Sequence, residues 1–73
     1  MPVAKNHRKL LGEAIRDRRK EVGLTQEKLA EKSNLSTIFI SRVERGVESP
    51  SIDNLVRIAK GLGVQVRDIV SGF

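Results

Sequence analysis

The segment 36–45 carries side chains of the types that read the edges of DNA base pairs. In a helix, where successive residues turn by about 100°, Ile40 and Val43 define a buried side. Four other residues then lie on the outward face of this helix, which does not pack in a hydrophobic core. An isoleucine can contact a thymine methyl group, hydroxyl groups can bond to several bases, and an arginine can bond guanine twice. We therefore expect base contacts from Thr37, Ile38, Ser41 and Arg42.

Contacts to DNA phosphates are expected where helices begin, because free backbone N–H groups and the positive helix end favour an anion there. One helix is expected to begin near residue 25 and another near residue 36, and a basic residue follows the end of the second. The expected phosphate contacts are Thr25, Gln26, Ser36 and Arg45.

Two of these residues have other interpretations that the sequence leaves open. Ile38 could cover a neighbouring helix or contact a second protein, and not DNA. Gln26 could be an ordinary exposed residue in the first turn of its helix.

Two charged residues border apolar stripes and are not explained by a solvated surface. Arg19 lies near the stripe of the first helix, and Glu44 lies near that of the third. If these helices pack together, the two side chains form an ion pair. Its role is structural, because it fixes the angle of the third helix, and losing one partner would leave a costly unpaired charge.

Five short helices are needed to position these residues. They are expected at about 7–22, 25–32, 36–45, 51–62 and 66–70. Polar residues cap four starts (Asn6, Thr25, Ser36, Ser51), and glycines end three helices (Gly23, Gly46, Gly63). Apolar stripes at helical spacing are predicted in the first helix (Leu11, Ala14, Ile15, Val22) and the fourth (Ile52, Leu55, Ile58, Ala59, Leu62).

No strand-like alternation is sustained, so we predict an all-α fold, a compact five-helix bundle. Its second and third helices form a helix-turn-helix through Ser33, Asn34 and Leu35. We expect an N-terminal tail at 1–6 and a single domain at 7–73, since 73 residues suffice for one compact domain only.

Composition excludes several functions. The chain has no cysteine, and its one histidine, His7, stands near an end that we expect to fray. A catalytic site, a metal ion, a cofactor and a small-molecule ligand are therefore not expected. No apolar run is long enough to span a bilayer, and the start lacks the apolar stretch of a secretory signal. We assign the protein to the cytoplasm.

Positive charge is concentrated at the start of the chain. The net charge is +5, and the first twenty residues, with seven basic and two acidic side chains, account for all of it. A basic end on a neutral body indicates a polyanionic partner, either nucleic acid or an anionic membrane surface, although a solvated face would look the same. The membrane is the weaker partner, because the core needs the apolar stripe of the first helix.

The sequence LTQEKLAEKSNLSTIFISRVERG, followed by SPSIDNLVRIAKGLGV, resembles the lambda-repressor-like, Xre-type helix-turn-helix family over about residues 12–69. The resemblance implies a third helix in the major groove and dimers on two half-sites. It gives Gln26 the phosphate-and-edge position, and Arg19 and Glu44 the inter-helix ion pair. Ser36, Thr37, Ile38 and Arg42 take the recognition-helix positions. Members often carry Gln, Arg or Asn where Thr37 and Ile38 stand, so the target sequence stays open.

A homodimer is expected because one recognition helix reads only about 4–5 base pairs, too few to select one site among roughly 10⁶ competitors. The expected dimer surface is the apolar C-terminal region, which could also close the core: Val64, Val66, Ile69, Val70 and Phe73.

These inferences predict a sequence-specific regulator of transcription that binds double-stranded DNA. A controller of a restriction–modification operon or a simple repressor of the prophage type is favoured. The alternatives are an antitoxin subunit that binds DNA and a toxin, and a protein-interaction module in which Ile38 and Phe39 form a hydrophobic patch.

Overall fold

Five helices form the computed structural model, which describes residues 6–71. The predicted all-α fold is confirmed in these residues. The helices are α1 (His7–Glu21), α2 (Gln26–Ser33), α3 (Thr37–Glu44), α4 (Ile52–Leu62) and α5 (Val66–Val70). The predicted limits of the tail (1–6) and the domain (7–73) stay a prediction.

Side-chain caps set where four of the helices begin. Each capping side chain accepts a hydrogen bond from the backbone N–H three residues further on, which satisfies a donor that the first helical turn leaves free. The caps are the four residues that the sequence predicts: Asn6, Thr25, Ser36 and Ser51.

Residues in the left-handed backbone conformation lie where helices end and the chain turns. Gly23, Gly46 and Gly63 have φ of 74°, 75° and 74°, as their predicted role as helix stops requires. In the turn between α2 and α3 the left-handed residue is Asn34, with φ of 56°. The chain folds back after each turn, so that α3 packs on α1 as well as on α2, and α4 packs on α2.

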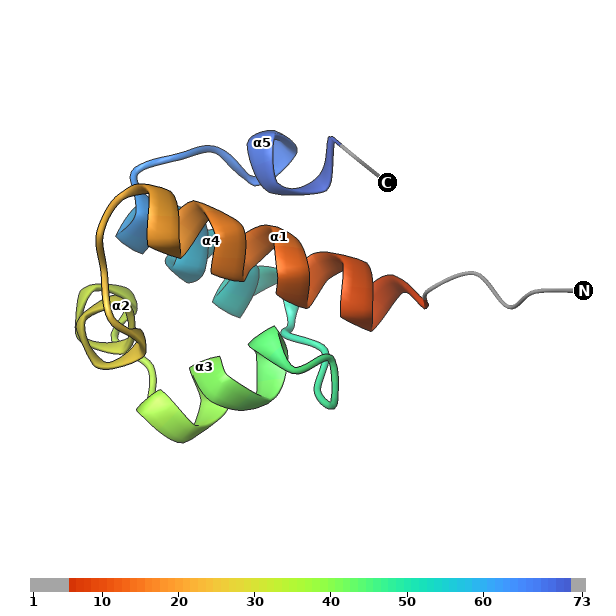
Figure 1. The fold of residues 1–73 in the computed structure, drawn as a ribbon, viewed down its shortest axis with the longest axis horizontal. Coiled ribbons are helices and arrows are strands. Elements are labelled where there is room, and N and C mark those ends of the chain that lie inside the picture. Colours follow the sequence, from red (N-terminus) through yellow and green to blue (C-terminus); the bar gives the residue numbers. More distant parts are fainter. Residues whose placement is uncertain (1–5, 72–73) are drawn as a thin grey trace, which may run out of the picture.

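The helices share one hydrophobic core. Its completely buried members include Ile15 of α1, Leu29 of α2, Ile40 of α3 and Ile58 of α4. α1 crosses the middle of the molecule, with α3 on one side of it and α5 on the other, while α4 lies behind it (Figure 1). α2 packs on both α3 and α4. In the helix-turn-helix, α3 therefore packs against α1, and α2 packs against α4.

Two predicted stripe residues are not in the core. Val22 is 48% exposed because it follows the last residue of α1, where the chain turns away from the helical phase. Ile52 is 67% exposed because it lies in the first turn of α4, at the edge of the stripe. Membership of an apolar stripe therefore does not make a residue buried when it lies at the end of a helix.

α1 and α3 approach each other so closely that their main chains touch. A Cβ atom at Gly12 of α1 would collide with the carbonyl oxygens of Val43 and Glu44 at the end of α3. One turn earlier, the backbone of Lys9 lies about as close to Gly46, where a Cβ atom would lie 3.0 Å from the Lys9 Cα atom. This contact fixes the position of α3 along α1 without relying on long side chains.

Candidate nucleic-acid interface

The four residues predicted to read bases lie on the side of α3 away from its core positions. Ile38 is 73% exposed and Arg42 is also exposed, while Thr37 and Ser41 are half-buried. Ile40 and Val43, on the opposite side, are buried in the core. α3 therefore presents a mixed face of methyl, hydroxyl and guanidinium groups to the exterior.

Ile38 and Phe39 differ in their surroundings, although they are adjacent in the sequence. Phe39 is half-buried and packs against the hydrophobic core. Ile38 is the most exposed large apolar side chain among the described residues, so no helix of the same chain covers it. The interpretation of Ile38 as a cover for a neighbouring helix is therefore wrong within the described chain.

Arg19 and Glu44, which the sequence predicts to pair, form a two-bonded ion pair between α1 and α3. The Arg19 Nε atom lies 2.7 Å from Glu44 Oε2, and Nη2 lies 3.0 Å from Oε1. The two side chains are only 12% and 2% exposed. The hydrogen bond to Glu44 raises the pKa of Arg19 above its ordinary value, with the negative charge of Glu44 adding to this and burial opposing it.

Gln26 belongs to the same network, which sequence reasoning missed. Its side-chain Nε2 atom donates a hydrogen bond of 3.0 Å to Glu44 Oε1. The amide donor therefore points back toward α3, and Gln26 is half-buried and not an ordinary exposed residue. The spacing of 18 residues gives no local signal for this contact.

The other predicted phosphate contacts lie at the surface. Thr25 and Ser36 are exposed caps at the starts of α2 and α3, and each hydroxyl already accepts a backbone hydrogen bond. Arg45 is also exposed, and its Nε atom donates to the backbone carbonyl oxygen of Ser41, at 3.3 Å. Arg45 thus keeps its remaining N–H donors available near the end of α3.

Arg42 has a partner that the sequence did not indicate. Its Nε atom lies 2.7 Å from Oε1 of Glu48, in the loop after α3. The two side chains are 48% and 37% exposed, so the pair lies at the surface. Glu48 is six residues further along the chain, a separation that does not place two residues on the same helix face. Only the turn that follows α3 brings them together.

The basic start of α1 lies beside this same loop. Asn6, His7 and Arg8 line a shallow hollow together with Ser49. Lys9 touches Gly46 at the end of α3. Part of the positive charge at the start of the chain therefore lies next to the C-terminal end of α3, where it can attract a phosphate backbone.

The predicted dimer surface is partly used inside the single chain. Ile69 is 2% exposed and belongs to the core, so it has no surface to offer a partner. Val64, Val66 and Val70 are half-buried and pack against that core. Phe73 lies outside the described residues. An apolar pair one turn apart on α4, Ile52 and Val56, is more exposed.

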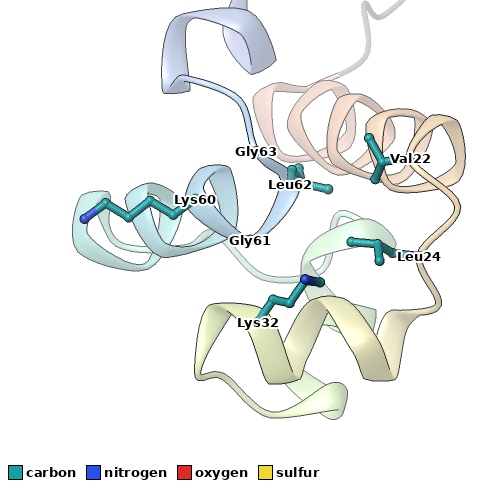
Figure 2. Close-up of a pocket in the computed structure, with 7 residues that line it drawn as sticks. All are labelled: Val22, Leu24, Lys32, Lys60, Gly61, Leu62 and Gly63. Carbon is teal, nitrogen blue, oxygen red and sulfur yellow. The ribbon is translucent and has the colours of Figure 1, made fainter.

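A second hollow of about 360 Å³ lies among the ends of three helices. It is lined by residues of α4 and of the segments around the ends of α1 and α2, including Lys32 and Lys60. Figure 2 shows these two lysine side chains pointing in different directions. Their ammonium groups therefore do not converge on one anion, and the hollow does not form a charged ligand site.

Two further features bear on the class of protein. Among residues 6–71, no group of three or more histidine, cysteine, aspartate or glutamate side chains is placed to hold a metal ion. None of the five helices has the length and hydropathy to cross a membrane.

A bundle whose third helix turns an exposed polar and apolar face outward, directly after a left-handed turn, is a helix-turn-helix domain. The profile of the HTH_3 family, described as helix-turn-helix, matches residues 15–69. The chain belongs to this family of DNA-binding, Xre-type transcriptional regulators, as the sequence predicts.

Named relatives match most of the chain. The control protein C.BamHI of Bacillus amyloliquefaciens is 39% identical over 69 residues, which cover 93% of this chain and 85% of that protein. The immunity repressor of Bacillus phage phi105 is 45% identical over 60 residues, which cover 82% of this chain and 42% of that protein. Both are named as regulators, and not as enzymes.

Two solved structures have the same fold. The restriction–modification controller protein C.AhdI from Aeromonas hydrophila has a TM-score of 0.83 and 32% identity, and the match covers 85% of this chain and 94% of that one. C.Esp1396I, solved bound to a 25 base pair operator site, has a TM-score of 0.84 and 35% identity, with 94% and 91% of the two chains covered.

Proposed function

We propose that the protein binds a two-half-site operator in double-stranded DNA as a homodimer, with α3 of each copy in the major groove. The observation that carries this proposal is the outward face of α3, where Ile38 is 73% exposed beside the guanidinium of Arg42. In the major groove, an isoleucine at this position can contact a thymine methyl group, and the neighbouring arginine can bond guanine. The C.Esp1396I structure, solved with operator DNA, supports the same use of the fold.

Within this function, the role of a restriction–modification controller has the best support. Three of the similar proteins are named as control or controller proteins: C.BamHI, C.AhdI and C.Esp1396I. A simple repressor and an antitoxin subunit are the alternatives within DNA binding.

The homodimer is proposed to form through exposed apolar residues of α4 together with the half-buried valines around α5. Ile52 and Val56 lie one turn apart and are 67% and 37% exposed. α4 and α5 are in contact, and the half-buried valines pack against the shared core. Burying these side chains against a second copy would remove apolar surface from water, which favours association.

The protein-interaction module has less support. It needs a contiguous apolar patch on α3, but Phe39 packs against the core and leaves Ile38 without an apolar neighbour on that helix. Patches that bind proteins usually extend over several hundred Å².

Selection of bound sites from random duplex DNA tests the function. We expect enrichment of a two-fold symmetric sequence with half-site centres about one helical turn, roughly 34 Å, apart. Affinity for the selected site should fall by orders of magnitude between about 50 and 200 mM salt. The proposal fails if no sequence is enriched, or if the affinity for the enriched DNA barely changes with salt.

Sedimentation of matched valine variants tests the dimer surface. Val56→Lys should shift the protein toward the monomer, because a charged side chain would then be buried between the copies. Val22→Lys, at a valine that is 48% exposed outside the proposed surface, should leave the dimer intact. Equal behaviour of the two variants would contradict this surface.

A further inference from the structure

We propose that Glu48 determines specificity by holding Arg42 in the orientation that reads guanine. This inference rests on the proposed function of the protein and adds a residue to its recognition surface. Glu48 does not lie on α3 and was not expected to take part in recognition.

The ion pair uses only one of the five N–H donors of the arginine. The Arg42 Nε atom donates to Glu48 Oε1 at 2.7 Å. The four N–H groups on the two Nη atoms form the far end of the guanidinium. Guanine presents two acceptors in the major groove, O6 and N7, which two parallel N–H groups can contact at once. When Glu48 holds the Nε atom, the N–H groups on the two Nη atoms remain available to contact guanine.

The turn after α3 fixes Glu48 at this position. The backbone N–H of Val47 donates to the carbonyl oxygen of Arg42 at 3.1 Å, and that of Gly46 donates to Val43 at 3.0 Å. With Gly46 in the left-handed conformation, these two bonds form a Schellman motif, which folds the chain back over the last turn of the helix. Glu48 follows directly, so its carboxylate reaches Arg42 from a backbone that is already ordered.

The carboxylate also disfavours the wrong contacts of Arg42. A phosphate can be bound side-on through Nε and one Nη atom, but Glu48 already occupies Nε. Its negative charge also repels the backbone of any DNA in the groove, whatever the base sequence. The repulsion lowers the affinity for all DNA, whereas the occupied Nε atom weakens phosphate contacts of Arg42 on random DNA more than a guanine contact at the right position.

The test compares Glu48→Gln with Glu21→Gln. Both remove one negative charge from a surface glutamate paired with an arginine, but Glu21 pairs with Arg18 on α1 and not with α3. Dissociation constants are measured at fixed salt for the selected site, for that site with each guanine replaced in turn, and for random duplex DNA.

We expect Glu48→Gln to bind random DNA several-fold more tightly and to lose roughly tenfold of the preference for guanine at one position per half-site. Glu21→Gln should strengthen binding to every sequence by one similar factor and keep the preference. In an Arg42→Ala background, Glu48→Gln should have no further effect on base preference, because the group that it orients is gone.

The inference is overturned if wild-type protein binds its selected site while both glutamine variants keep the same guanine preference. It is also overturned if Glu48→Gln changes base preference equally with and without Arg42. A wild-type protein that selects no sequence would instead refute the proposed function, so the two failures are distinguishable.

Discussion

The carboxylate of Glu44 accepts hydrogen bonds from Arg19 of α1 and from Gln26 of α2, at 2.7 and 3.0 Å. The guanidinium of Arg19 also donates a hydrogen bond from Nη1 to the carbonyl oxygen of Leu24, at 2.9 Å. One buried carboxylate at the end of α3 thus joins three parts of the chain. Since hydrogen bonds restrict direction as well as distance, this network restrains the angle of α3 against the rest of the bundle.

Glu44→Ala should be strongly destabilising. It leaves the buried guanidinium of Arg19 without its counter-ion, and breaking a buried pair in this way costs about 3–5 kcal/mol. Urea unfolding followed by circular dichroism would measure the loss. Glu21→Ala, which breaks the exposed pair with Arg18, is the control and should cost less than about 1 kcal/mol. Equal losses in the two variants would show that the Arg19–Glu44 pair does not have this structural role.

Gly12→Ala should destabilise the fold although alanine favours helices. The new Cβ atom would meet carbonyl oxygens of Val43 and Glu44, and backbone cannot rotate away as a side chain can. We expect a net loss of about 1–3 kcal/mol in the free energy of unfolding. Arg16→Ala, at an exposed position of the same helix, should change it little. A stabilised Gly12→Ala variant would contradict the close contact between α1 and α3.

Ser33→Ala should stabilise the protein by roughly 0.5–1 kcal/mol. Ser33 is 3% exposed, and its hydroxyl is the buried side-chain group without a hydrogen-bond partner among residues 6–71. The same substitution at the capping Ser36 should instead cost about 1 kcal/mol. Thermal unfolding of the two variants should therefore move in opposite directions, and a shared direction would contradict the environment described for Ser33.

The Ser33 hydroxyl also explains a glycine in α4. A Cβ atom at Gly61 would lie 2.5 Å from Ser33 Oγ. Gly61→Ala should therefore be tolerated better when residue 33 is alanine, because the crowded atom has been removed. A double-mutant cycle measures this coupling, and strictly additive effects would show that α2 and α4 are not so close at this point.

Arg42→Ala and Arg45→Ala should separate base reading from phosphate binding. Arg42→Ala is expected to cost about 1–3 kcal/mol on the selected site and to relax the preference at one base, whereas Arg45→Ala should weaken all sequences by nearly the same factor. Titrations on specific and random DNA make the comparison. If Arg42→Ala weakens both kinds of DNA equally, Arg42 does not read a base.

Local chemistry explains why most of the fold could be predicted from the sequence. Capping side chains and left-handed glycines act within three or four residues, so Ser36 and Gly46 mark the limits of α3 without knowledge of the tertiary structure. The exposure of Ile52 in the predicted stripe of α4 was not foreseen, because periodicity gives the direction of a residue but not whether a partner covers it.

The contacts that were missed connect residues across turns. Glu48 reaches Arg42 only through the turn after α3, and Gln26 reaches Glu44 across 18 residues. Gly12 could not be recognised as a contact residue either, since its role depends on how closely α3 approaches. Arg19 and Glu44 could be paired in advance because each is a charged residue at the border of an apolar stripe.

The main-chain contact between α1 and α3 has a consequence for how such a protein can diverge. Gly12 touches the carbonyl oxygens of Val43 and Glu44 at the end of α3, whereas Thr37, Ile38 and Arg42 lie on the face turned away from the core. Replacing the outer side chains therefore leaves the contact between α1 and α3 unchanged. If α3 reads DNA as proposed, a gene duplicate could acquire a new operator through a few substitutions on one face, without first having to repack its interior.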